Sequence, residues 1–98
     1  MNIKKMINGE ILTLYVAGRI DTTNAKEFEE VIATELKNIT GLIMDFAELE
    51  YISSAGLRVL LIAIKQMKKQ GSMKIVHSNE MVKEIFEVTG FADLVEVE

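Results

Sequence analysis

Two adjacent serines, Ser53 and Ser54, offer the clearest chemistry in this sequence, because they stand just before an apolar segment long enough to be a helix. A serine at a helix start accepts hydrogen bonds from backbone N–H groups that lack a partner, and most such serines only cap the helix. The same position also presents a hydroxyl among donors that favour a phosphate group. The spacing alone therefore leaves two interpretations open, a structural cap and a phosphorylation site.

Other reactive side chains do not assemble into an enzyme-like set. The only histidine, His77, is far in sequence from any serine and aspartate that would complete a catalytic triad. Asp45, Glu48 and Glu50 cluster at the end of a predicted strand, where we favour a solvated loop over a divalent-cation site. The six glycines occur singly, so no Walker loop or dinucleotide fingerprint is present. We expect no catalytic activity, no cofactor and no bound metal.

Length and composition predict one small domain that spans residues 1–98. The chain has 98 residues, 49% of them hydrophobic, and carries a formal charge of -4. It contains no cysteine, which excludes disulfides and thiolate zinc sites and suits a reducing cytoplasm. No signal peptide or membrane span is visible, so we expect a cytoplasmic protein without a membrane partner. The net acidity argues against direct nucleic-acid binding.

The charges are unevenly distributed along the chain. Residues 51–79 contain five basic residues and no acid, whereas the remainder contains six basic and fifteen acidic residues. Lys65, Lys68 and Lys69 fall near the end of a predicted helix, where cations complement the helix dipole and line a solvated face. We favour that interpretation for the lysines.

The apolar periodicity predicts strands and helices in the order ββαβαβαβ. Residues 3–7 and 11–16 form two strands joined by a turn at Asn8-Gly9, and the helix over 22–36 begins with Thr22 or Thr23 as its N-cap. A buried strand over 42–46 and a largely buried helix over 57–69 follow, with Gly71 closing that helix.

The last part of the chain continues the alternation of strands and helices. It comprises a strand over 73–76, a helix over 79–89 and a strand over 94–97. In that helix, apolar residues are expected to face inward, namely Met81, Val82, Ile85, Phe86 and Val88. Strands that alternate with helices form a mostly parallel sheet with right-handed crossovers, and the first hairpin adds one antiparallel strand. The expected fold is thus α/β with a mixed sheet.

Two motifs give the chain a resemblance to the STAS domain family, the anti-sigma-factor antagonists of bacteria. Gly18-Arg19-Ile20-Asp21 resembles the family's Gly-x-[Leu/Ile]-Asp after the second strand, and residues 51–57 (Tyr-Ile-Ser-Ser-Ala-Gly-Leu) resemble its Asp-Ser-[Ser/Thr/Ala]-Gly-Leu loop before the long helix. The order and spacing of the motifs also fit, and the resemblance covers nearly the whole chain.

The resemblance implies that the protein is a non-enzymatic switch. Relatives of this kind bind an anti-sigma factor that is also a serine kinase, which releases a sigma factor, and a serine phosphatase reverses the phosphorylation that inactivates them. Ser54 falls on the phosphorylated position. The implied partner-binding residues are Asp21, Thr22, Thr23, Ser53, Ser54, Ala55, Gly56 and Arg58.

The sequence departs from the family pattern in two places within this loop and its helix. Ser53 stands where aspartate is common, which provides a second candidate hydroxyl, and Arg58 replaces a residue that is often small. A phosphorylation-independent STAS scaffold in a signalling or transport complex is therefore the alternative function, with a small-ligand or lipid carrier as a third. A homodimer also remains open.

Overall fold

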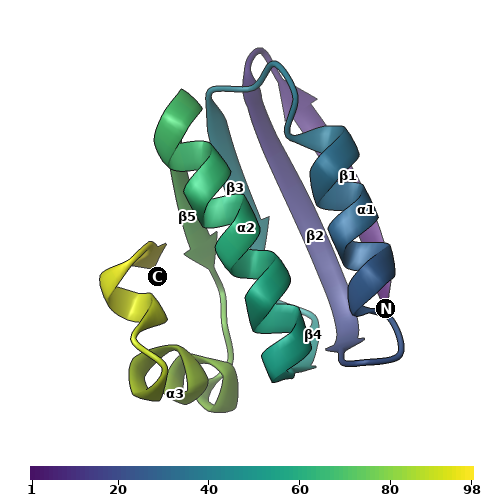
Figure 1. Cartoon of the computed structure of the whole chain (residues 1–98), viewed down its shortest axis with the longest axis vertical. Coiled ribbons are helices and arrows are strands. Elements are labelled where there is room, and N and C mark those ends of the chain that lie inside the picture. Colours follow the sequence, from purple (N-terminus) through teal and green to yellow (C-terminus); the bar gives the residue numbers. More distant parts are fainter.

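The computed structural model describes residues 1–98 as a sheet with helices packed against it (Figure 1). The strands are β1 (Asn2–Asn8), β2 (Ile11–Ile20), β3 (Gly41–Asp45), β4 (Leu49–Ile52), β5 (Ser72–Val76) and β6 (Glu96–Val97). The helices are α1 (Ala25–Glu35), α2 (Ser54–Gln70) and α3 (Glu80–Val88), and a short 3₁₀ turn, η1 (Phe91–Asp93), precedes β6.

The sheet is mixed and mostly parallel, as the sequence predicts. Its order is β1-β2-β3-β5-β6, with β4 paired to β2 outside that path. Only the β1–β2 hairpin is antiparallel, and every other strand pair is parallel. Parallel neighbours need a crossover connection, which α1, α2 and α3 provide.

The hydrophobic core lies between the sheet and the helices. Alternation along β2 shows which side is covered, because Leu12, Leu14 and Val16 are buried while Tyr15 between them is 39% exposed. In Figure 1, α1 and α2 lie side by side over the same face of the sheet. Side chains on that face therefore belong to the core, and those on the opposite face, such as Tyr15, meet solvent.

The sequence did not predict β4, whose pairing depends on a bend in β2. Residues 11–15 of β2 pair with β3, and from Gly18 onward the strand pairs with β4 instead, with an irregularity in register between Gly18 and Arg19. Gly18 has φ +90°, a left-handed conformation that side chains disfavour. Its N–H donates to the carbonyl of Glu48 at 2.9 Å, which joins the bend to the start of β4.

Several local predictions need correction. The first helix begins at Ala25 with Asn24 at the N-cap position, so neither Thr22 nor Thr23 is the cap. The long helix begins three residues earlier than predicted, at Ser54. Ile62 lies in the helix that was predicted to be largely buried, but it is 40% exposed. Met81 and Val88 of α3 were expected to face inward, but they are 56% and 77% exposed. None of the helices is long and apolar enough to cross a membrane.

Candidate functional site

The two motifs meet at one end of the sheet, where β2 and β4 lead into α1 and α2. Ile20 pairs with Ile52, and one residue further the N–H of Ser53 donates to the carbonyl of Ile20 at 2.8 Å. In Figure 1 both helices begin at this end of the molecule. The loop from Asp21 to Asn24 and the start of α2 therefore lie next to each other.

Ser53 is the N-cap of α2. Its backbone is extended, with φ -88° and ψ 175°, and its Oγ accepts a hydrogen bond from the N–H of Gly56 at 3.3 Å. The carbonyl of Ser53 accepts the first helical hydrogen bond, from Leu57. The side chain is half-buried and held by this interaction. Ser53 thus does what a capping residue does, and an aspartate at the same place could accept the same bond.

Ser54 is the first residue of α2 and differs from its neighbour in every respect that matters for modification. Its side chain is exposed, and its hydroxyl makes none of the side-chain hydrogen bonds in the structure. The N–H groups of Ser54 and Ala55 have no backbone acceptor, as expected for the first turn of a helix. A free hydroxyl therefore stands beside unused donors at the positive end of the helix.

Asp21 organises the neighbouring loop. Its Oδ1 accepts hydrogen bonds from the N–H of Thr23 at 3.0 Å and from the Thr23 hydroxyl at 2.5 Å. The Oδ1 of Asn24 accepts from the N–H of Asp21, and its Nδ2 donates to the carbonyl of Arg19, both at 2.9 Å. The loop is held by its own side chains, while Thr22 and Thr23 remain exposed. Sequence reasoning missed Asn24, although the Asp-x-x-Asn spacing was available as a signal.

Hydrogen bonding lowers the pKa of Asp21 below its ordinary value of 3.8. The Thr23 hydroxyl contributes most, followed by the Thr23 N–H, with a smaller contribution from the charge of Arg19. Each of these groups favours the ionised carboxylate. Asp21 is therefore an anion at neutral pH, half-buried beside the start of α2.

Gly56 belongs to the signature loop but is buried, so its contribution is to packing. A Cβ at this position would lie 2.7 Å from Cγ2 of Ile20 and 2.8 Å from Cγ1 of Ile52. Any larger residue would push α2 away from the ends of β2 and β4. Ala55 is half-buried and packs against the core, so Ser54 and Arg58 are the exposed members of this segment.

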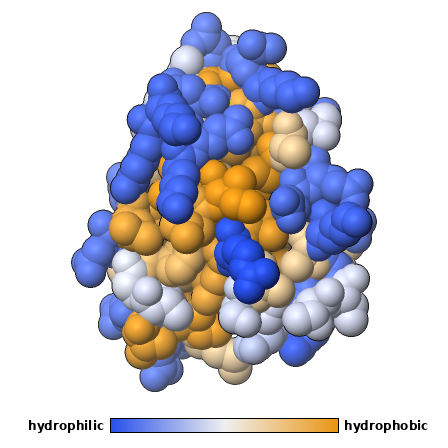
Figure 2. All heavy atoms as spheres, viewed as in Figure 1, coloured by the Kyte–Doolittle hydropathy of each residue, from blue (hydrophilic) through white to orange (hydrophobic).

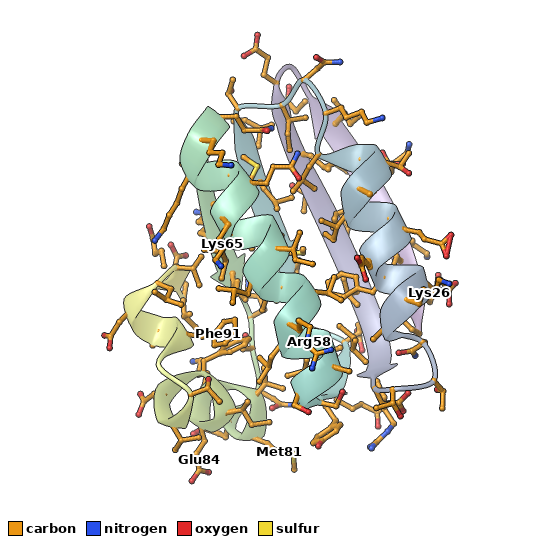
Figure 3. All side chains as sticks on the ribbon, in the orientation of Figure 1. Lys26, Arg58, Lys65, Met81, Glu84 and Phe91 are labelled. Atoms are coloured by element: carbon orange, nitrogen blue, oxygen red, sulfur yellow. The ribbon has the colours of Figure 1, made fainter.

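Two arginines stand near the serine pair. Arg58 is exposed, one turn along α2 from Ser54 (Figure 3). Arg19 lies with its guanidinium carbon 4.7 Å from the centroid of the Tyr51 ring and with Nε 4.0 Å from Oδ2 of Asp21. The Arg19–Tyr51 contact forms because these residues pair across β2 and β4. Only the pairing of the strands reveals it.

The acidic cluster considered in the sequence is separated by the fold. Oδ1 of Asp45 accepts from the N–H of Ala47 at 3.0 Å, and Oδ2 lies 3.1 Å from Nδ1 of His77. Glu48 and Glu50 are exposed and contribute to no group of three side chains that could hold a metal ion. Asp45 ends β3 and Glu50 lies in β4, so these two residues belong to strands and not to one loop.

The mixed sheet and the two loops at its end are features by which the chain can be compared with known protein families. The STAS domain family matches residues 2–98. The chain belongs to this family. The Gly18 bend, the Asp21 loop and the serine pair before α2 are the places where its two sequence motifs fall.

Several of the similar proteins are anti-sigma factor antagonists. One is BtrV of Bordetella bronchiseptica, assigned as an anti-sigma factor antagonist, which is 34% identical over 86 residues covering 86% of this chain and 74% of that protein. An antagonist from Mycobacterium paratuberculosis has a crystal structure that superposes with a TM-score of 0.88 at 20% identity, over 98% of this chain and 83% of that one. The Bacillus cell fate determinant SpoIIAA, solved in its phosphorylated form, gives a TM-score of 0.76 at 16% identity, over 99% and 91%.

Proposed function

We propose that this protein is an anti-sigma factor antagonist that binds an anti-sigma factor through the surface around Ser54 and is switched off by phosphorylation of that serine. The single observation that carries the proposal is the division between the two serines: Ser53 caps α2, whereas the hydroxyl of Ser54 is exposed and unbonded. The relative BtrV is assigned the same function, and SpoIIAA is known in a phosphorylated form.

The binding surface combines Ser54 and Arg58 with the exposed threonines of the Asp21 loop. The partner is an anti-sigma factor with serine-kinase activity, and a phosphatase restores the free hydroxyl. Occupying the anti-sigma factor frees a sigma factor, so the protein regulates transcription in the cytoplasm without touching DNA. Its action is binding and not catalysis.

Phosphorylation acts on binding because it leaves the fold almost undisturbed. A phosphate at the first residue of α2 meets the positive end of the helix dipole, which stabilises the domain by roughly 0.3–1 kcal/mol. In an interface the same dianion must lose its water, and a buried charge without a matched partner costs several kcal/mol. A loss of about 4 kcal/mol weakens binding a thousandfold.

The experiment measures the melting temperature and the affinity for each anti-sigma factor of the host cell, with wild-type and Ser54-phosphorylated protein. Ser54→Ala should bind as wild type does and Ser54→Asp should bind weakly. The phosphorylated protein should melt at or slightly above the wild-type temperature and bind at least about a thousandfold more weakly. Ser53→Ala is the matched control, since it removes the adjacent hydroxyl and leaves Ser54 to accept the phosphate.

Two results would contradict the switch: phosphate found on Ser53, or a Ser54-phosphorylated protein that binds normally. If no anti-sigma factor binds the wild-type protein, the antagonist function itself is wrong and a scaffold function takes its place.

A further inference from the structure

The long helix α2 carries cations and no carboxylate. Its 17 residues contain Arg58, Lys65, Lys68 and Lys69 and not one acid, although the whole chain has a formal charge of -4. Exposed lysines on the other helices have acids of their own helix within one turn. Lys26 precedes Glu29 and Glu30 in α1, and Lys83 lies between Glu80 and Glu87 in α3. The positive charge of α2 therefore stands out from an acidic background.

The exposed residues of α2 fall on one side of the helix, which also carries Ser54. At about 100° of rotation per residue they occupy an arc of about 120°, opposite the seven buried residues of α2. We call this set, together with the half-buried Leu61 on the same side, the α2 stripe; it consists of Ser54, Arg58, Leu61, Ile62, Lys65, Lys68 and Lys69. From Ser54 to Lys69 it is about 22 Å long. Figure 3 labels Arg58 in the lower part of α2 and Lys65 further along it.

Nothing within the protein accounts for all four charges. The ion pairs of the structure join Lys5, Arg19, Lys74 and His77 to carboxylates, and no α2 cation takes part in one. Lys68 and Lys69 lie in the last turn, where the helix dipole favours cations. The dipole offers no such support to Lys65 in the middle of the helix, and it opposes Arg58 near the positive end. Neither an ion pair nor the helix dipole therefore stabilises these two cations.

An apolar region lies at the centre of the α2 stripe. Ile62 is 40% exposed and Leu61 is half-buried beside it. Seen from the same side as the ribbon, the molecular surface shows hydrophobic side chains over its middle that continue to the lower left, with hydrophilic ones mainly above and to the right (Figure 2). An apolar centre with a charged rim is the usual arrangement of a protein–protein interface.

We propose that the α2 stripe docks on an acidic surface of the same protein partner that engages Ser54, with Ile62 against an apolar patch and Arg58 and Lys65 opposite carboxylates. This inference rests on the proposed function, and it extends the contact from the first turn of α2 over most of the helix. The occupant is a partner of negative surface charge, because unpaired cations favour one and repel a basic surface.

Arg58 also connects this surface to the phosphate switch. A phosphate on Ser54 would stand four residues N-terminal to Arg58, the spacing and order in which an anion and a cation pair best on a helix. The phosphate would then compete with the partner's carboxylates for the Arg58 guanidinium. Phosphorylation removes part of the docking surface as well as adding a charge.

The test compares charge reversal at two lysines, one on the α2 stripe and one on the opposite side of the molecule. Lys65→Glu changes the α2 stripe, and Lys4→Glu makes the same change of net charge on β1, where Lys4 pairs with Tyr15 on the sheet face away from the helices. Both lysines are exposed and outside the ion pairs of the structure, so neither variant should disturb the fold. The assay records association and dissociation rates with the anti-sigma factor that binds the wild-type protein, from low salt to about 0.5 M salt.

Lys65→Glu should slow association about tenfold at low salt, with the difference shrinking as salt rises, whereas Lys4→Glu should stay within about twofold of wild type. Ile62→Ala should speed dissociation about tenfold, because buried apolar contacts act mainly on the dissociation rate. If one anti-sigma factor distinguishes Ser54→Ala from Ser54→Asp but treats Lys65→Glu and Lys4→Glu alike, the inference is wrong and the proposed function stands. If none binds the wild-type protein, both are wrong.

Discussion

Removing the hydroxyl of Ser53 should lower the stability of the domain, and removing that of Ser54 should not, because only the Ser53 side chain makes a hydrogen bond in the fold. Ser53→Ala removes the acceptor for the N–H of Gly56, and loss of an N-cap costs about 0.5–2 kcal/mol. The bond is 3.3 Å long, at the weak end for an N–H donor, so we expect the lower part of that range, about 0.5–1 kcal/mol.

This free energy converts into a measurable change in melting temperature. Unfolding entropy near 2.1 cal/mol/K per residue gives about 0.2 kcal/mol/K for 98 residues, so Ser53→Ala should lower Tm by about 2–5 °C. Ser54→Ala removes no hydrogen bond and introduces a better helix former, so its Tm should equal or slightly exceed that of wild type. Ser53→Asp keeps a hydrogen-bond acceptor at the N-cap and adds a negative charge at the positive end of the helix dipole. Its Tm should therefore equal or exceed that of the wild-type protein.

Differential scanning calorimetry on the wild-type protein and the three variants is sufficient. A Ser54→Ala protein that melts several degrees lower, beside a Ser53→Ala protein that melts as wild type, would refute the assignment of cap and free hydroxyl. The choice of Ser54 as the modified residue would then lose its structural basis.

Two further predictions concern the groups that hold the site in shape. Gly56→Ala should lower Tm by about 5–15 °C, since its Cβ would come within 2.7–2.8 Å of side chains from β2 and β4 and overpacking of this kind costs about 1–3 kcal/mol; an unchanged Tm would show that α2 moves freely. Asp21→Asn tests the lowered carboxylate pKa. The stability that ionised Asp21 contributes is fully present above the pKa of this carboxyl in the unfolded chain, and it is lost as pH falls through the lower pKa in the folded protein. Any Tm difference between wild type and Asp21→Asn should therefore disappear well below pH 3.8. A Tm difference that persists in acid would contradict the lowered pKa.

The regular elements could be predicted from the sequence because their causes are local. Alternation along residues 11–16 and the Asn8-Gly9 turn produce the hairpin, and helical spacing before Leu36 produces α1. Gly71 ends α2 as expected, although for a different reason. Its φ is 170°, and a Cβ would lie 1.8 Å from the carbonyl oxygen of Thr40, so close backbone approach and not a left-handed turn requires glycine.

Predictions failed where a residue's surroundings come from distant parts of the chain. The four residues of β4 are too few to show a strand pattern of their own, and they form a strand through their pairing with residues 18–20 of β2. Met81 and Val88 fit the apolar periodicity of α3, yet only the side of the helix that carries Val82 and Phe86 is buried against the rest of the protein. Periodicity identifies an apolar face, but it does not say how much of that face another element covers.

The sequence by itself determined the α/β class, the two motifs and a choice between two hydroxyls, because each of these depends on residue type and spacing along the chain. Only the tertiary structure showed which of the two serines caps the helix. It placed the Ile20 carbonyl against the N–H of Ser53, which set Ser53 as the cap and left Ser54 free in the first turn of α2. It also separated the cations of α2 from the protein's carboxylates, since ion pairing depends on distance in space and not on position in the sequence.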